Sequence, residues 1–85
     1  MSESQQRSRL KRKRNPMPQF VRDALIEGDL MAAYKARPPY QQNDYIGWII
    51  RAKRSDTQQK RLAQMLRELA GGDRYMNMKY NARQH

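Results

Sequence analysis

The chain contains no cysteine and a single histidine, His85, at its last position. The lack of cysteine excludes a disulfide framework, a thiolate metal site and a cysteine nucleophile. Small secreted domains usually depend on disulfides or metals, so this absence favours a cytoplasmic protein. The acids that follow the N-terminal segment are scattered, and none forms a pair at the spacing of a metal or acid–base site. We therefore expect no metal, no cofactor and no enzymatic activity.

Apolar residues are also scarce, at 38% of 85 residues, and the mean hydropathy is -1.17. A chain of this length and composition has room for one small domain with a small core. No stretch approaches the ~20 apolar residues of a membrane-spanning helix. No signal peptide is visible either, because Arg22 and Asp23 interrupt the apolar residues that follow the basic N-terminal segment.

Positive charge, by contrast, is abundant: 18 Lys and Arg residues face 8 acids, which gives a formal net charge of +10. Residues 1–15 hold six of these cations but only one acid, and Leu10 is their single apolar residue after Met1. Such a segment cannot form a core, and we predict a disordered basic tail. A basic chain attracts nucleic acid, an anionic membrane surface or an acidic protein. The alternative is a solvated tail that only aids solubility.

A proline-containing boundary, residues 15–18, separates the tail from a helical domain that we place at residues 18–72. The apolar spacing after it predicts two short helices, the first at 19–27 and the second at 30–35. Gly28 is expected to end the first helix. Asp29 is expected to cap the second.

Two longer amphipathic helices, predicted at residues 40–53 and 56–70, are the centre of the fold. The first carries a core stripe of Tyr45, Trp48 and Ile49 at i, i+3 and i+4. The turn between the helices is so short that the second must fold back on the first as a helical hairpin. The sequence therefore predicts a small all-α domain of about four helices organised around this hairpin.

Local signals support the ends of the second long helix. Ser55 and Gln58 match a capping box, in which Ser55 caps the helix and Gln58 reaches back to its amide. Gly71-Gly72 predicts a left-handed C-cap. Within the first long helix, Gly47 lowers the helix propensity and can permit the close approach of another helix.

The predicted core combines the two long helices with the short helices before them. Its members are Phe20, Leu25, Tyr45, Trp48, Ile49, Leu62, Leu66 and Leu69. We expect Trp48 to be mostly buried between the long helices. Residues 73–85 are expected to form an irregular tail, because no other segment offers a strand partner for their alternating pattern.

Two groups of cations are candidates for contact with a polyanion. The first is in the tail: Lys11, Arg12, Lys13 and Arg14. The second surrounds the hairpin turn: Arg51, Lys53, Arg54, Lys60 and Arg61. We expect Arg51 and Arg54 to lie one turn apart on the outer helix face, and Arg61 to project away from the apolar stripes. Helix amides at the same end would add to phosphate binding.

A solvated helix end is the alternative interpretation of the second group. The sequence contains no recognition-helix motif, RNA-binding sheet motif or zinc finger that would decide between the two.

The run YIGWIIRAKRSDTQQKRLAQMLRELAGG resembles the C-terminal helical segment of the YdeI/OmpD-associated family, also called bacteriocin-protection proteins. The matching features are a Tyr–x–x–Trp–Ile helix, Ala-Lys-Arg, a Thr after the turn, a basic pair and a long helix ending near Gly. Here they are Tyr45, Trp48, Ile49, Ala52–Arg54, Thr57, Lys60–Arg61 and Leu62–Gly72. The resemblance covers roughly residues 18–75 and implies an all-α fold.

Two features depart from the family pattern. Many relatives carry a β-rich N-terminal domain where this chain has its basic tail, and Arg often follows the Thr where this chain has Gln58-Gln59. The resemblance links relatives to tolerance of cationic antimicrobial peptides and implies no specific activity.

Two functional hypotheses follow. In the first, the chain is a non-enzymatic module that binds nucleic acid or another polyanion through its tail and hairpin turn. Alternatively, it is a protein-interaction module with a protein partner in envelope stress or bacteriocin tolerance, as the family resemblance suggests.

Overall fold

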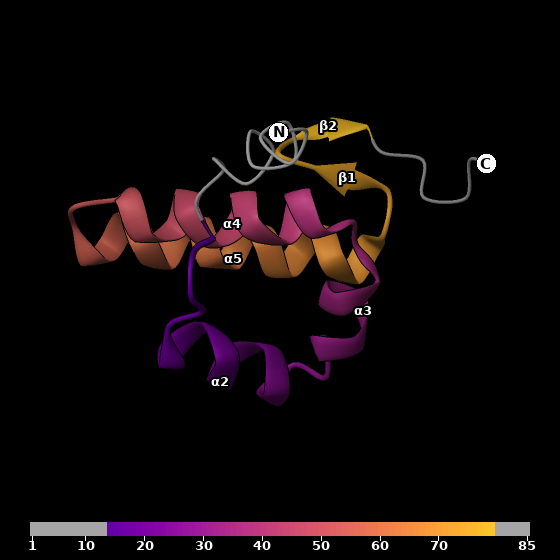
Figure 1. Ribbon diagram of the computed structural model, residues 1–85, viewed down its shortest axis with the longest axis horizontal. Helices are drawn as coiled ribbons and strands as arrows, with labels where there is room; N and C mark the ends of the chain where they lie inside the picture. The colour runs from indigo at the N-terminus through magenta and orange to yellow at the C-terminus, as the bar shows by residue number, and fades with distance from the viewer. Residues whose placement is uncertain (1–13, 80–85) are drawn as a thin grey trace, which may run out of the picture.

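A computed structural model describes residues 14–79 of the chain. Residues 1–13, where most of the predicted disordered tail falls, lie outside the described residues. Residues 80–85 also lie outside them. The elements are α2 (Gln19–Glu27), α3 (Met31–Ala36), α4 (Pro39–Arg51), α5 (Ser55–Gly71), β1 (Arg74–Tyr75) and β2 (Met78–Lys79) (Figure 1). The prediction of a mostly helical fold is confirmed. None of the helices in this part of the chain is both long enough and apolar enough to cross a membrane.

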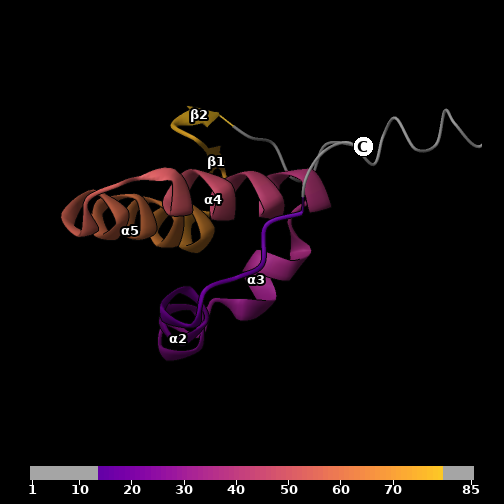
Figure 2. The same ribbon diagram turned by 60° about the vertical axis from the view of Figure 1, so that its left-hand side comes forward.

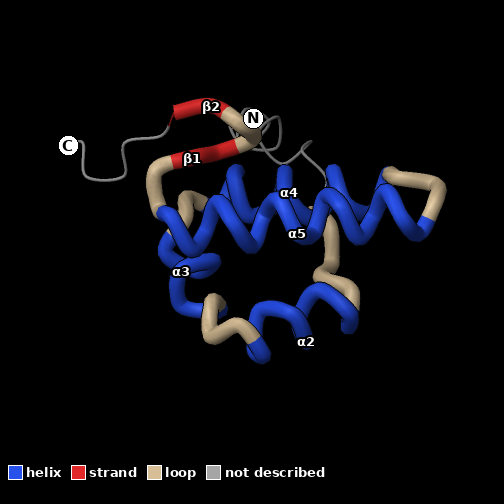
Figure 3. The backbone as a smooth tube through the Cα atoms, turned by 180° about the vertical axis from the view of Figure 1, so that it is seen from behind, coloured by secondary structure: helices blue, strands red, loops and turns tan. Residues whose placement is uncertain are grey.

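The helical hairpin is formed by α4 and α5, which lie side by side along the long axis of the molecule (Figures 1 and 3). Helix α4 ends at Arg51, two residues earlier than predicted, because Ala52 adopts an extended conformation with ψ 129°. Helix α5 ends at Gly71, and Gly72 has the predicted left-handed conformation, with φ 84°. Glycine adopts this conformation without steric cost, so the helix stops here.

The predicted capping box at the start of α5 is wrong. Arg54 occupies the N-cap position and Ser55 is already helical. Gln58 does reach back, but its Nε2 donates to the Ala52 carbonyl at 3.0 Å instead of accepting from the Ser55 amide. This hydrogen bond joins the start of α5 to Ala52, the residue that follows α4. It therefore helps to close the helical hairpin.

Helices α2 and α3 cover one side of the helical hairpin, and the two strands cover the opposite side (Figure 2). The junction between α2 and α3 corrects a prediction, because Asp29 does not cap α3. Asp29 has φ 57° and supplies the left-handed residue that ends α2, while Gly28 has φ -87°. The Leu30 amide then donates to the Leu25 carbonyl at 2.8 Å, which closes the helix end. Aspartate tolerates this conformation better than most side chains.

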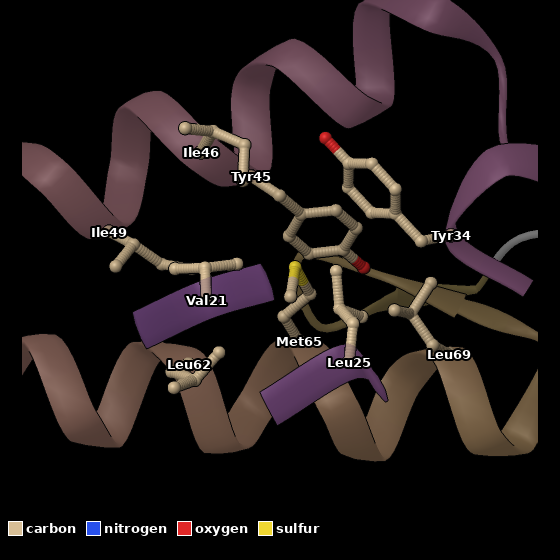
Figure 4. Packing of buried hydrophobic residues seen from close by; sticks show 9 residues of the cluster. All are labelled: Val21, Leu25, Tyr34, Tyr45, Ile46, Ile49, Leu62, Met65 and Leu69. Atoms are coloured by element: carbon tan, nitrogen blue, oxygen red, sulfur yellow. The ribbon is translucent and has the colours of Figure 1, made fainter. Parts of the chain in front are cut away.

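The core lies between the helical hairpin and α2 and α3, with Tyr45 fully buried near its centre (Figure 4). Its buried apolar cluster is Val21, Leu25, Tyr34, Tyr45, Ile46, Ile49, Leu62, Met65 and Leu69. Three predicted core residues, Phe20, Trp48 and Leu66, are only half-buried and pack against this cluster. Trp48 packs at the edge of this cluster, whereas Tyr45, Ile46 and Ile49 are fully buried within it.

Residues 74–79 form a β-hairpin, whereas residues 73–85 were predicted to be an irregular tail; residues 80–85 lie outside the described part of the chain. Its strands pair antiparallel, with Arg74 opposite Lys79 and Tyr75 opposite Met78. Met76 and Asn77 form the two-residue turn, and both have left-handed backbones, with φ 53° and 68°. Turns of this kind match the twist of the strands. The prediction failed because each strand finds its partner within the same segment.

Candidate functional site

A buried carboxylate, missed by the sequence analysis, joins the helical hairpin to the β-hairpin. Glu68 of α5 is 5% exposed. One carboxylate oxygen, Oε1, accepts from the Tyr45 hydroxyl at 2.5 Å and the Met76 amide at 2.8 Å. The other, Oε2, accepts from the Asn77 amide at 2.7 Å and from Gln64 Nε2 at 3.1 Å. The carboxylate therefore fixes the turn of the β-hairpin, including the two left-handed residues.

The electrostatics of this carboxylate favour its ionised form. Burial acts to raise the pKa of Glu68, but hydrogen bonds from Tyr45, the Asn77 and Met76 amides and Gln64 outweigh it and lower the pKa. Burial, followed by the hydrogen bond to Glu68 and its negative charge, raises the pKa of Tyr45. The phenol thus stays protonated as a donor. With four donors on its two oxygens, the carboxylate holds structure together and is a poor proton acceptor for a reaction.

A second buried polar group, Arg37, lies at the same end of the helical hairpin. Arg37, between α3 and α4, is 6% exposed. Its Nη1 donates to Gln41 Oε1, and its Nη2 donates to the Glu68 main-chain carbonyl, each at 3.0 Å. A buried cation without partners is costly, so Arg37 has to keep these hydrogen bonds in the folded state. They fix the position of the α3–α4 connection relative to the end of α5.

The β-hairpin closes over this network through an aromatic side chain. The Tyr75 ring lies edge-to-face against Tyr45, with ring centroids 5.3 Å apart, and against Tyr40 at 6.1 Å. Its hydroxyl donates to Asp44 Oδ2 at 2.8 Å. One sequence signal could have found this network: Glu68 lies between Met65 and Leu69 on the apolar side of its helix, where an acid needs partners.

The cations predicted to bind a polyanion differ in their exposure and contacts where the structure describes them. Four residues around the hairpin turn are exposed: Arg51, Lys53, Arg54 and Lys60. Of the tail residues, Arg14 is exposed, whereas Lys11, Arg12 and Lys13 lie outside the described residues. The remaining predicted site residue, Arg61, is half-buried.

Arg54 differs from its predicted position. It follows the end of α4, so it does not lie one helical turn from Arg51 on the same helix. Its guanidinium donates to both carboxylate oxygens of Asp56, at 3.2 and 3.1 Å. The two side chains are 77% and 61% exposed, so the pair contributes little to stability. It does place a negative charge beside this cation.

The prediction that Arg61 projects away from the apolar stripes is wrong. Its Nη1 donates to the Trp48 carbonyl at 2.7 Å, and its guanidinium carbon lies 5.3 Å from the centre of the Trp48 ring. This cation–π contact and hydrogen bond join α5 to α4. Arg61 therefore belongs to the packing of the helical hairpin.

The N-terminal segment meets α4 at a point that we call the tail anchor, formed by Asn15, Asn43 and Gly47 (Figure 1). The Asn15 amide donates to Asn43 Oδ1 at 2.7 Å, and Asn15 Nδ2 donates to the Asn43 carbonyl at 3.2 Å. A methyl group at Gly47 would lie 2.6 Å from Asn15 Nδ2 and 3.1 Å from Arg51 Nη1. Gly47 thus makes room for Asn15 and not, as expected, for another helix.

These features define a small basic helical domain built on a helical hairpin. A comparison with protein families matches residues 16–72 to the family described as OmdA: bacteriocin-protection, YdeI or OmpD-associated. The match spans more than half of the chain, and the chain belongs to this family. A comparison with curated proteins found no significant match, and neither did a comparison with solved structures.

Proposed function

We propose that this chain is a non-enzymatic module that binds nucleic acid or another polyanion through its basic N-terminal segment and the exposed cations of α4 and the hairpin turn. The observation that carries the proposal is the +10 net charge, together with the exposed side chains of Arg14 and Arg51. Lys53 and Lys60 add exposed charge nearby in the sequence. Phosphate contacts by such side chains give salt-dependent, sequence-independent affinity.

A non-enzymatic role is supported by the state of the one buried acid. Glu68 accepts from four donors, which leaves it poorly suited to take a proton from a substrate. A cytoplasmic location, expected from the lack of cysteine, would give the module access to nucleic acid.

The test is fluorescence anisotropy with a labelled random-sequence duplex and a labelled single strand of equal length, measured at low salt. We expect both to bind, with affinities that fall steeply as salt is added. Inorganic phosphate at the same ionic strength serves as a competitor that controls for simple ion binding. If the intact protein binds neither oligonucleotide at low salt, the proposal is wrong.

The family match favours a second candidate, a protein-interaction module in bacteriocin tolerance or envelope stress. A chain of +10 charge repels cationic peptides, so its partner would be an acidic protein and not the peptide itself. A pull-down from native lysate, with and without nuclease, separates the candidates. A protein that stays bound after nuclease treatment supports this one, and proteins lost with the nucleic acid support the first.

A further inference from the structure

We propose that the exposed ring of Tyr40 is a stacking site for an unpaired nucleobase, so that the module binds single-stranded nucleic acid more tightly than charge alone allows. This inference rests on the proposed function and deepens it by naming the class of polyanion. The site, which we call the aromatic platform, consists of Tyr40, Tyr75 and Met78.

The aromatic platform is an exposed apolar surface where the β-hairpin meets the start of α4 (Figure 1). Tyr40, in the first turn of α4, is 50% exposed, and Met78 of β2 is 56% exposed. The Tyr40 ring lies edge-to-face against Tyr75, with ring centroids 6.1 Å apart. Met78 is the cross-strand partner of Tyr75, and residues directly opposite each other share one face of a sheet. Tyr75 thus links the two exposed side chains.

The Tyr40 ring is held in place although the residue is half exposed. Its hydroxyl accepts from Gln41 Nε2 at 3.1 Å. Gln41 is fully buried, and its Oε1 accepts in turn from the buried Arg37. The Tyr75 ring, which supports Tyr40 from the side, is fixed by the hydrogen bond from its hydroxyl to Asp44. A ring that is already fixed loses little entropy when a ligand stacks on it, which favours binding.

Two cations of the β-hairpin stand opposite each other. Arg74 and Lys79 are cross-strand partners, and both are exposed. Like charges directly opposite each other on a sheet repel, and residues 74–79 contain no acid. A phosphate between the two cations removes this repulsion. Although they project from the face opposite to Tyr75, long side chains reach past the edge of a ribbon that is two strands wide.

A third cation shares one face of α4 with Tyr40. Arg51 follows Tyr40 by eleven positions, which is close to three whole helical turns. A rise of 1.5 Å per residue places their backbones about 16 Å apart along the helix. Roughly five nucleotides at a spacing of about 3.4 Å span this distance. A strand whose phosphates contact Arg51 is therefore able to place a base at Tyr40.

Stacking on Tyr40 requires a base whose face is free. In a duplex each base is covered by its neighbours, whereas the unstacked bases of a single strand are available to aromatic side chains. Cations attract both forms, and the aromatic platform adds affinity for the single strand. The ligand class is therefore single-stranded DNA or RNA.

The test compares two labelled strands of equal length by fluorescence anisotropy at one low salt concentration. One is a single strand of mixed sequence, and the other is an abasic strand, which has the same phosphates but no bases. We expect the unaltered protein to bind the strand with bases about tenfold more tightly. Tyr40→Ala should remove this difference without changing the affinity for the abasic strand. Tyr40→Phe keeps the ring and should retain the difference.

The control for loss of exposed apolar surface is Ile26→Ala. Ile26 is 58% exposed on α2, on the side of the helical hairpin opposite to the strands (Figure 2). This variant should bind both strands as the unaltered protein does. Circular dichroism checks that each variant is folded, and the comparison of the two strands with the unaltered protein needs no variant.

The cross-strand cations are tested with two charge-matched double variants. One combines Arg74→Gln with Lys79→Gln, and the other combines Arg22→Gln with Lys35→Gln, all at exposed positions. The slope of log affinity against log salt for the abasic strand should become shallower by about 0.9 per lost phosphate contact in the first variant only. Equal slopes in the two variants would overturn the role of Arg74 and Lys79.

The outcomes separate this inference from the proposed function. Equal affinity of the unaltered protein for the two strands overturns the inference and leaves the proposed function standing. A difference that persists in Tyr40→Ala, or that is lost in Tyr40→Phe, also overturns it, because the ring is then not the group that acts. If the unaltered protein binds neither strand at low salt, the proposed function fails and the inference fails with it.

Discussion

Glu68 shows how much a single residue can decide in a domain this small. The apolar spacing of α5 correctly predicts which face of the helix is inside, with Leu62 and Leu69 both buried. It does not reveal that the acid on that face receives four hydrogen bonds. Two of the donors are amides of the Met76–Asn77 turn, whose left-handed backbone cannot be read from local sequence. The acid and the turn stabilise each other, so neither was predictable alone.

Replacing this acid with its amide should destabilise the domain strongly. Glu68→Gln substitutes an NH₂ group for one acceptor, so at least one of the four donors loses its partner and the charge is removed. We expect a loss of about 2–3 kcal/mol in the free energy of unfolding, measured by urea denaturation. Tyr45→Phe removes a single donor and should cost less. Equal stability of Glu68→Gln and the unaltered chain would contradict the role of Glu68 as the anchor of the β-hairpin.

The same carboxylate predicts how stability depends on pH. The folded pKa of Glu68 lies below its ordinary value, so the folded state binds a proton there less readily than the unfolded chain. Its contribution to stability is therefore present above the unfolded pKa of about 4.3. It is lost as pH falls through the folded pKa. The urea concentration at the midpoint of unfolding should decrease as the pH is lowered from 7 to 3. Glu68→Gln should show a smaller fall, and identical profiles would refute the assignment.

At the scale of elements, the long helices were predictable because their apolar residues repeat at the helical period over several turns. The ends of the helices were harder to predict. Both the Ser55 cap and the Asp29 cap were wrong, because the actual hydrogen bonds reach other segments or use the backbone. Trp48 was placed in the core because of its size and register. Tyr45, also predicted to be in the core, is fully buried, whereas Trp48 lies half-buried at the edge of the core under Arg61.

This placement predicts a moderate effect of removing the indole. Trp48→Ala should cost about 1–2 kcal/mol, less than the 3–5 kcal/mol expected for a fully buried tryptophan, whereas Tyr45→Ala should prevent stable folding. The fluorescence of Trp48 should be intermediate between buried and fully exposed tryptophan, and Arg61→Gln should shift it toward the exposed value. An emission maximum typical of a fully buried indole would contradict the structure.

At the scale of the whole molecule, composition predicted a basic chain, but sequence proximity was a poor guide to what each cation near the hairpin turn contacts. Arg54 is paired with Asp56 and Arg61 packs against Trp48, while the Arg51 guanidinium lies beside Gly47. The tail anchor could not be foreseen, since Asn15 and Asn43 are far apart in the chain and Gly47 suggested the approach of another helix, not of Asn15.

Truncation tests where the folded domain begins. Removing residues 1–13 should leave the melting temperature almost unchanged, because Leu10 is the only apolar residue after Met1. Removing residues 1–15 also deletes the two bonds to Asn43 and should lower the melting temperature by about 4–8 °C, equivalent to roughly 1 kcal/mol. Thermal denaturation followed by circular dichroism measures both. Equal melting temperatures for the two truncations would show that the anchor adds no stability.

The most direct test of the central claim is the salt dependence of nucleic-acid binding for two charge-matched variants. One replaces Arg51, Lys53 and Lys60 with Gln, and the other replaces the exposed Arg22, Lys35 and Arg67 with Gln. Both lose the same charge. If the exposed cations near the hairpin turn contact phosphates, the slope of log affinity against log salt should become shallower by about 0.9 for each lost contact in the first variant only. Equal slopes in the two variants would show that binding follows net charge alone and would contradict a defined polyanion site on this domain.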